Sequence, residues 1–363
     1  MIYCVGSNIC FLISLKRLNL LINITKIVLY YYQKVIHIIP PIKEIDVLYI
    51  TFEKNDNFFS YNHKRLHVIQ LDYDFWGRLL LAMISGKLLI TTTPSINVLS
   101  LKKSPNIKHY SYYMHAPVDI HSYQKYSFDY FDSIICVGNF QKISLEYLEK
   151  IRNLTNKEKT ILGLPYADLY AKDNTYCNND KTILIAPSWG NNNFLNYIDY
   201  DIFNTVLSAG YKVIYRPHPM SLLEEKEQIN NIINKYHNNE NFTYNNDFNN
   251  IQAIRSSNIL ISSISGIILD YILFHTANVL LIDIPEYKTN NLEAYDLKHN
   301  SWESMVYNDI CIKINSEEEL VLALQINHTT NQDIINKHKN EIANFGHSAT
   351  EISKFLLNKY REL

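Results

Sequence analysis

Residues 259–271 read ILISSISGIILDY, a short apolar run that ends at serines and passes directly into an apolar helical pattern. The run fits a buried strand, and Ser265 stands where a helix N-cap is expected, just before Gly266. The same alternation fills the second half of the chain. Strand patterns lie at 182–186, 212–215, 241–244, 258–262 and 277–283. Helix patterns lie at 202–209, 222–237, 250–255 and 265–275. Such alternation indicates a parallel sheet covered by helices on both faces.

The first half of the chain carries a similar pattern. Its apolar runs are 45–52, 66–71, 87–92, 109–114 and 133–137, and helix patterns lie at 77–85 and 141–152. The apolar residues 1–15 are too few to span a bilayer. A signal peptide carries its positive charge before its apolar stretch, whereas here Lys16 and Arg17 follow it. We therefore expect a first core strand there followed by a helix, while an amphipathic segment lying on a membrane surface stays open.

A polar stretch without periodicity, residues 171–181, separates the two halves and is predicted to be a linker. The sequence thus predicts an α/β protein of GT-B architecture, with two facing Rossmann-like domains, each built on a parallel sheet. We place an N-terminal domain at 1–172 and a C-terminal domain at 181–340. A helical pattern over 333–360 closes the chain, and its last part, 341–363, is predicted to return to the first domain.

The composition excludes several classes of protein. Hydrophobic residues make up 47% of the chain and charged residues 19%, which is typical of a folded protein. The formal net charge is −2, so the chain lacks the basic excess expected of a protein that binds nucleic acid. The nine glycines form neither G-x-G-x-x-G nor a P-loop. The five cysteines contain no C-x-x-C and form no cluster with histidines, so no metal site is predicted.

Residues 213–219 read VIYRPHP, a strand pattern that stops at two prolines. Prolines end a strand and fix the backbone that follows. They would hold the guanidinium of Arg216 and the imidazole of His218 at the carboxyl edge of the sheet, where both can neutralise a phosphate. The alternative is a rigid turn with an exposed arginine and a capping histidine, and both interpretations stand.

The helix expected after Ser263 offers a second site for an anion. Its free N–H groups and the positive end of its dipole would begin at Ser265 and Gly266, where the glycine lets a ligand come close to the backbone. An ordinary helix capped by serine is the alternative.

Residues 112–121 read YYMHAPVDIH, so His115 lies at a turn fixed by proline just beyond a strand of the first domain. If the domains face one another, His115 would face the phosphate of a ligand held by the second domain. An imidazole titrates near neutral pH, so His115 could act there as a general base toward an acceptor hydroxyl. His121 in the same loop is the competing candidate.

These elements occur in an order that resembles the CDP-glycerol glycerophosphotransferase family, the GT-B enzymes that build teichoic-acid and related capsule polymers. The Arg-Pro-His motif of that family matches at 216–218. Its His-Gly-Thr-Pro motif is reduced to His-Ala-Pro at 115–117, and its Pro-Thr-Trp-Arg motif appears as Pro-Ser-Trp-Gly at 187–190. Its Thr-Asp-Tyr-Ser-Ser motif appears as Ser-Ser-Ile-Ser-Gly at 262–266. The likeness covers roughly residues 110–283.

The resemblance implies roles for individual residues. His115 would be the catalytic base and His218 the catalytic partner of the donor pyrophosphate. The predicted donor-binding residues are Ser188, Arg216, His218, Ser263, Ser265 and Gly266. The chain departs from the family where Ser263 replaces Asp, Gly266 replaces the second Ser, and Gly190 replaces the motif Arg. These departures concern the donor more than the fold.

The function implied is the transfer of glycerol phosphate, or another polyol phosphate, from a CDP-activated donor to a hydroxyl of a surface glycan, teichoic-acid-like polymer or capsule polymer. The first domain would hold the acceptor and the second the nucleotide. The resemblance implies no metal and no cofactor beyond the donor substrate. The expected partners are the nucleotide-activated donor and a glycan or lipid-linked acceptor, with no nucleic acid. We expect a cytoplasmic protein, and peripheral contact with the inner face of the cytoplasmic membrane stays open.

Two other functions remain open on the sequence. One is a GT-B glycosyltransferase that uses a nucleotide sugar in capsule or surface-polysaccharide synthesis. The other is a non-catalytic scaffold of a glycan-assembly complex. A metal-binding D-x-D of the GT-A type at residues 72–74 carries little weight, because the same letters recur at 199–201.

Overall fold

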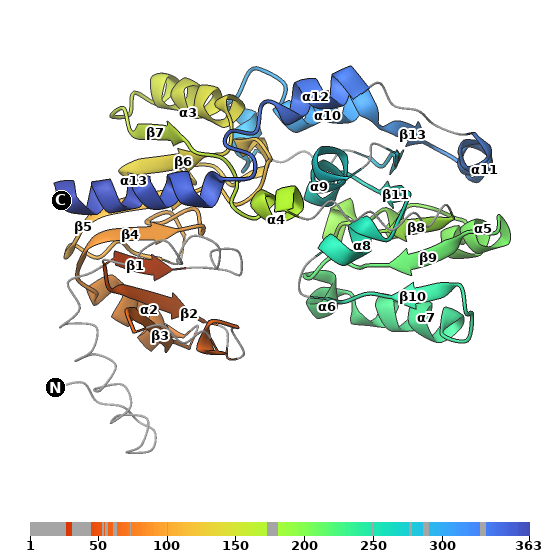
Figure 1. The fold of residues 1–363 in the computed structure, drawn as a ribbon, viewed down its shortest axis with the longest axis horizontal. Coiled ribbons are helices and arrows are strands. Elements are labelled where there is room, and N and C mark those ends of the chain that lie inside the picture. The colour runs from red at the N-terminus through yellow and green to blue at the C-terminus, as the bar shows by residue number, and fades with distance from the viewer. Residues whose placement is uncertain are drawn as a thin grey trace, which may run out of the picture.

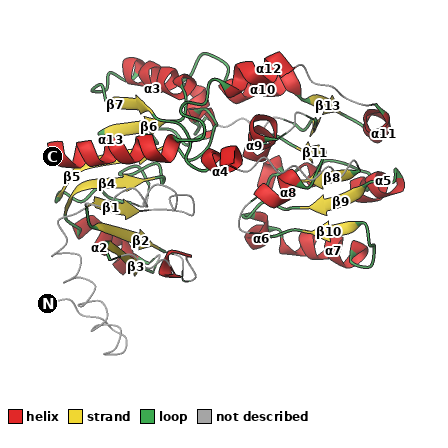
Figure 2. Cartoon of the chain, viewed as in Figure 1, coloured by secondary structure: helices red, strands yellow, loops and turns green. Residues whose placement is uncertain are grey.

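The protein is described here by a computed structural model. It describes residues 27–30, 45–52, 54, 57–60, 64–72, 74–99, 101–172, 181–247, 250–275, 278–285, 290–326 and 332–363. Figure 1 shows two separate groups of strands, and Figure 2 shows helices around both of them. In these residues no helix combines the length and the apolar character needed to cross a lipid bilayer.

The first sheet has seven parallel strands in the order β3-β2-β1-β4-β5-β6-β7. They are β1 (Ile27–Tyr30), β2 (Val47–Thr51), β3 (Leu66–Gln70), β4 (Gly86–Thr91), β5 (Ile107–Tyr113), β6 (Ser133–Cys136) and β7 (Glu158–Ile161). The helices of this half are α2 (Phe75–Met83), α3 (Asn139–Ile151) and α4 (Ala167–Lys172).

The second sheet has six parallel strands in the order β10-β9-β8-β11-β12-β13. They are β8 (Thr182–Ile185), β9 (Lys212–Tyr215), β10 (Phe242–Tyr244), β11 (Ile259–Ser262), β12 (Val279–Ile282) and β13 (Ile312–Ile314). Its helices are α5 (Ile202–Ser208), α6 (Ser221–Glu224), α7 (Lys226–Tyr236), α8 (Ile251–Arg255), α9 (Gly266–Phe274), α10 (Trp302–Ile310) and α11 (Glu317–Gln325). The chain ends in α12 (Gln332–Lys339) and α13 (Ser348–Glu362).

The strand order in both sheets is that of a Rossmann fold. Each sheet starts in its interior, grows to one side over three strands, and then crosses to the other side of its first strand. The crossing puts a switch point between β1 and β4 in the first sheet, and between β8 and β11 in the second. Ligands of such sheets bind outside the carboxyl ends of the strands at the switch point. In Figure 1 the arrows of β2 and β9 point toward one another, so the carboxyl ends of the two sheets face each other.

The last helix packs on the first sheet. Alternate residues of neighbouring strands, among them Tyr49 and Ile90, form a buried cluster with Ile352 and Leu356 of α13. The intervening residues, such as Tyr112, point to the opposite face and join a different cluster. The predicted return of the C-terminal helix to the first domain is therefore confirmed.

The single terminal helix predicted over 333–360 is wrong, because an irregular turn over residues 340–347 separates α12 from α13. Asn344 (φ 50°) and Gly346 (φ 91°) have left-handed backbone conformations there, which a continuing helix does not allow. The turn approaches the first domain so closely that a Cβ at Gly163 would lie 1.9 Å from the carbonyl oxygen of Ala343. Docking of this turn, rather than the local helical pattern, decides where the helix ends.

The helix predicted over 222–237 is also interrupted, since α6 and α7 meet at Glu225. The Glu225 carboxylate accepts hydrogen bonds from the backbone N–H of Gly190 (3.0 Å) and from Nδ2 of Asn193 (3.2 Å). Glu225 thereby ties this turn to the loop that follows β8.

The other predicted strands and helices are present, with ends displaced by no more than two residues. Six elements were not predicted from the sequence: β1, β7, β13, α4, α10 and α11. The strand expected within residues 1–15 lies outside the described residues. So does most of the predicted linker 171–181, whose first two residues belong to α4. The domain limits 1–172, 181–340 and 341–363 stay predictions.

Candidate active site

Three neighbouring strands bring the predicted donor-binding residues to one edge of the second sheet. Ser188 follows β8, His218 follows β9 and Ser263 follows β11, and β9, β8 and β11 are consecutive in the sheet. The loops also contact one another. The Trp189 ring stacks on that of His218, with centroids 6.0 Å apart and planes inclined by 23°. The hydroxyl of Ser263 donates a hydrogen bond to the carbonyl oxygen of Asn192.

Helix α9 begins at this edge, as predicted. Ser265 occupies the N-cap position, but its side chain makes no capping hydrogen bond, and its carbonyl oxygen accepts from the hydroxyl of Tyr307 at 3.1 Å. Gly266 is exposed, and a Cβ built on it would meet no atom within 4 Å. The first N–H groups of a helix have no partner within it, and its dipole makes that end positive. The start of α9 can therefore receive an anion.

Arg216 is already engaged by the protein. Its Nη1 donates to Oδ1 of Asn245, and its Nη2 donates to the carbonyl oxygen of Asp247 at 2.9 Å, so it fixes the loop that follows β10. Burial lowers the pKa of Arg216, and the nearby Asp247 carboxylate opposes that shift. A guanidinium has five N–H donors, and two of its nitrogens here serve the fold. Direct phosphate binding by Arg216 stays a prediction.

His218 is half-buried, and its Nδ1 accepts a hydrogen bond from the backbone N–H of Met220 at 3.1 Å. His218 therefore caps the turn that follows β9, which is the alternative role considered for it from the sequence. An imidazole that accepts at Nδ1 carries its proton on Nε2 when neutral. That tautomer can cap the turn through one nitrogen and donate to a phosphate through the other, so the two interpretations of His218 are compatible.

His115 lies on the loop that follows β5, at the carboxyl end of the first sheet. Gln141 of α3, which is fully buried, holds this loop. Its Nε2 donates to the carbonyl oxygens of Ala116 (3.3 Å) and Val118 (2.7 Å). The structure thus places the predicted base and the predicted donor-binding residues on different sheets, at the carboxyl ends that face one another (Figure 1).

A buried hydrogen-bond network joins α9 to the first half of the chain. The hydroxyl of Tyr166 donates to one carboxylate oxygen of Asp270, and Nδ2 of Asn250 donates to the other at 2.8 Å. Asn250 in turn accepts from the hydroxyl of Tyr170 at 3.1 Å. Burial, reinforced by Asp270, raises the pKa of Tyr166 well above its ordinary value. Sequence reasoning missed this network, although a lone aspartate within the apolar pattern of α9 signals a buried partner.

A second connection between the halves is ionic. The guanidinium of Arg152, at the end of α3, contacts Asp129 (2.9 Å), Asp296 (2.8 Å) and Glu293. The side chain of Glu293 is fully buried. Burial raises the pKa of Glu293, and Arg152 opposes the shift. The backbone N–H of Lys125 also donates to the carbonyl oxygen of Asn291 at 2.7 Å, which fastens the segment after β12 to the first half.

No protein-family model matches the chain, and no curated protein matches it. Solved structures share its fold. The UDP-GlcNAc 2-epimerase of Methanocaldococcus jannaschii matches with a TM-score of 0.56 and 10% identity, over 92% of this chain and 99% of the other. The UDP-N-acetylglucosamine 2-epimerase of Rickettsia bellii matches with a TM-score of 0.55 and 11% identity, over 93% and 98%. S. aureus MnaA, solved with UDP, matches with a TM-score of 0.53 and 12% identity, over 92% and 97%.

The predicted GT-B fold is confirmed by these likenesses and by the two parallel sheets. At such low identity they establish the fold and not the activity. The fold is GT-B rather than GT-A, so the D-x-D pattern does not indicate a metal site of the GT-A type. Asp74 and Asp201, the last residues of its two occurrences, instead cap α2 and α5 by accepting from backbone N–H groups.

Proposed function

We propose that the chain is a GT-B transferase that binds a nucleotide-activated donor at the carboxyl edge of the second sheet and transfers the activated group to a hydroxyl. One observation carries the proposal. The switch point between β8 and β11 coincides with the start of α9 and lies one strand from His218. A switch point and a helix N-terminus are both places where proteins bind the phosphates of a nucleotide. The imidazole of His218 adds a hydrogen-bond donor beside them.

The chemistry of transfer fits the two facing edges. The nucleotide leaves as an anion, and the positive end of α9 together with Nε2–H of His218 would stabilise the charge that develops on it. His115, across from them, would accept the proton of the attacking hydroxyl as the new bond to oxygen forms. Each edge would then supply one half of the reaction.

A nucleotide sugar is the donor that we place first. The proteins of similar fold include UDP-GlcNAc 2-epimerases, whose names give a nucleotide sugar as substrate. A second candidate, a CDP-polyol, is supported by the match at 216–218 to the Arg-Pro-His motif of the glycerophosphotransferases. The two donors differ in the bond that breaks. Attack at the anomeric carbon of a sugar releases a nucleoside diphosphate, whereas attack at the polyol phosphate of a CDP-polyol releases CMP.

The released nucleotide therefore tests the function. Purified protein would be incubated with UDP-sugars or CDP-glycerol and with glycan acceptors, and the nucleotides would be separated by chromatography. Release of UDP that depends on acceptor supports the first candidate, and release of CMP supports the second. Conversion of the donor to an isomer without any acceptor would contradict transfer.

Loss of the His218 imidazole is expected to weaken binding of the donor nucleotide about tenfold to a hundredfold. One charge-assisted hydrogen bond is worth about 1.5–3 kcal/mol, which corresponds to that range in affinity. Calorimetric titration of UDP and CDP into wild type and His218→Ala measures it. His237→Ala, an exposed histidine at the end of α7, is the matched control. Equal nucleotide affinity in wild type and His218→Ala would remove His218 from the site.

A further inference from the structure

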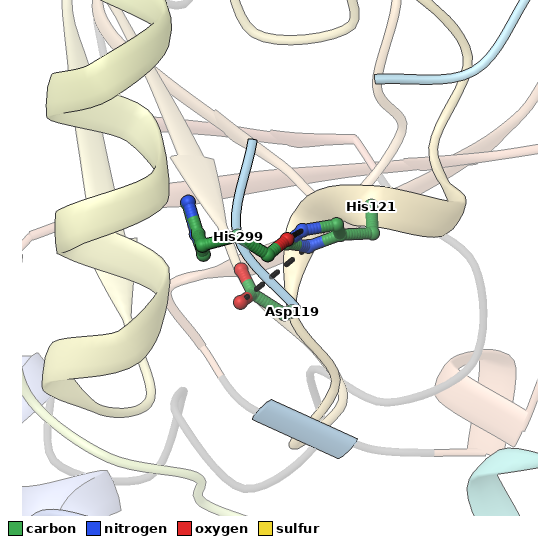
Figure 3. Close-up of side chains that lie close together, drawn as sticks. All are labelled: Asp119, His121 and His299. Atoms are coloured by element: carbon green, nitrogen blue, oxygen red, sulfur yellow. Dashed lines mark hydrogen bonds and ion pairs between the residues drawn. The ribbon is translucent and has the colours of Figure 1, made fainter. Parts of the chain in front are cut away.

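One carboxylate and two imidazoles that are distant in the sequence come together beside the loop of His115. They belong to Asp119, His121 and His299 (Figure 3). We propose that this cluster binds a divalent transition-metal ion, with Zn²⁺ as the reference ion, and that the bound ion joins the two halves of the chain. The proposal does not depend on the donor site.

The spacing of the three side chains suits a metal ion. Oδ2 of Asp119 lies 3.5 Å from Nδ1 of His121, and one ligand atom from each of the three residues lies within 4.8 Å of the others. Ligand atoms about 2.0–2.2 Å from a tetrahedral zinc ion are about 3.4 Å apart. Asp119 and His121 already have that separation. His299 is exposed, so its ring can shift by the short distance that remains when an ion binds.

The outer hydrogen bonds orient the ligands as in metal sites, where each histidine gives its second ring N–H to an oxygen. Nε2 of His121 lies 2.9 Å from the carbonyl oxygen of His299, which leaves the lone pair on Nδ1, the atom facing Asp119. The hydroxyl of Ser144 lies 2.9 Å from Nε2 of His299 and can orient that ring. Oδ1 of Asp119 accepts from the backbone N–H of Ile120 at 2.8 Å, while Oδ2 faces His121.

The buried carboxylate of Asp119 favours a positive charge between it and the two imidazoles. Asp119 is 1% exposed, and within the described residues no lysine or arginine forms an ion pair with it. Glu303 adds a second buried carboxyl, since its Oε2 accepts from the backbone N–H of Asp119 at 2.8 Å. A buried carboxylate is stabilised by hydrogen bonds, by an ion pair or by a coordinated metal ion. Besides facing His121, Oδ2 of Asp119 accepts only a long hydrogen bond, 3.4 Å, from the backbone N–H of Trp302 among the described residues. The alternative to a metal site is simple edge-to-face packing of the His121 and His299 rings, whose centroids are 5.1 Å apart. That packing places no metal ion beside the Asp119 carboxylate.

The ligand set indicates the kind of ion. Two imidazoles with one carboxylate suit zinc and similar transition metals, whereas Mg²⁺ and Ca²⁺ prefer sets made of oxygen. Three protein ligands leave a fourth position for water. Asp119 and His121 come from the first half and His299 from the second, as Figure 3 shows. A bound ion would therefore add a further connection between the halves, beside those of Arg152 and Asp270.

Zn²⁺ titration of the full chain tests the proposal. Protein stripped with a chelator and transferred to chelator-free buffer would be titrated by calorimetry, and wild type should bind one ion per chain. His299→Ala removes an exposed ligand, so the affinity is expected to fall by at least the roughly 10–100-fold that loss of an outer hydrogen-bond partner of a ligand costs. His237→Ala should bind as wild type does. Zn²⁺ should also raise the melting temperature of wild type and His237→Ala more than that of His299→Ala.

Two results would overturn the metal site. One is wild type without saturable Zn²⁺ binding. The other is His299→Ala with the affinity and the melting-temperature shift of wild type. If His299→Ala does not fold, His299→Gln keeps polar atoms at that position while removing the imidazole, and the same comparison applies to it.

Discussion

Replacement of His115 by alanine is expected to lower turnover about 10²–10⁴-fold while the affinity for the donor nucleotide stays nearly unchanged. His115 lies on the first sheet, whereas the residues expected to hold the donor phosphates lie on the second. Removal of a base that acts only on the acceptor hydroxyl should therefore affect the rate and not donor binding. The rate of the wild-type enzyme should fall at acidic pH, where an imidazole is protonated, and this limb of the profile should be lost in the variant.

A structural role of His115 would give a different result. If the imidazole only supports the loop, His115→Ala would lower the melting temperature and keep its activity per folded molecule, so both are measured together. His347→Ala is the control, because this exposed residue precedes α13 and its side chain makes no capping hydrogen bond. His121, the competing candidate on the sequence, contacts Asp119 and His299 through its ring nitrogens, and is thereby less suited to be the base.

Replacement of Arg152 by alanine is expected to lower the free energy of unfolding by about 3–5 kcal/mol. The variant leaves the Glu293 carboxylate, whose side chain is fully buried, without its counter-charge. Denaturant unfolding at neutral pH measures the loss. Because burial raises the pKa of Glu293 above its unfolded value, the loss should shrink as the pH falls and the carboxylate takes up a proton.

Two further variants separate this effect from ordinary surface charge. Lys142 of α3 forms an exposed pair with Glu146 at 4.0 Å, and Lys142→Ala should cost less than about 1 kcal/mol. The double variant Arg152→Ala with Glu293→Gln should recover part of the loss, because it removes the buried charge as well. An Arg152→Ala variant as stable as Lys142→Ala would show that the ionic connection contributes little to stability.

The sequence sufficed for the strands that position the site, because buried parallel strands are short apolar runs and local periodicity marks them. It failed for β7, whose residues EKTI are half-exposed and polar, and for β13, which has only three residues. It also failed at the turn between α12 and α13. That helix ends where Ala343 meets Gly163, a contact between distant segments that no local pattern encodes.

The positions of most candidate site residues could also be predicted from the sequence, but their contacts could not. Strand ends placed His115, Ser188, His218, Ser263 and Gly266 at the carboxyl edges of the two sheets. The engagement of Arg216 by Asn245 depends on the neighbouring strand β10 and could not be foreseen. The expectation of no metal site rested on the lack of nearby ligands in the sequence, and it stays a prediction that the proposed Zn²⁺ titration tests. His121 and His299 are 178 residues apart, and only the fold brings them together.

The central claim is that donor phosphates bind at the start of α9, and calorimetric titration of UDP and CDP into Gly266→Ala tests it most directly. A methyl group at this position meets no protein atom within 4 Å, and its φ lies outside the left-handed region, so the variant should fold as wild type does. A phosphate held against the backbone there would collide with the methyl group. We expect the affinity for the nucleotide that wild type binds to fall at least about tenfold, at an unchanged melting temperature. Equal affinity in wild type and variant would contradict the account.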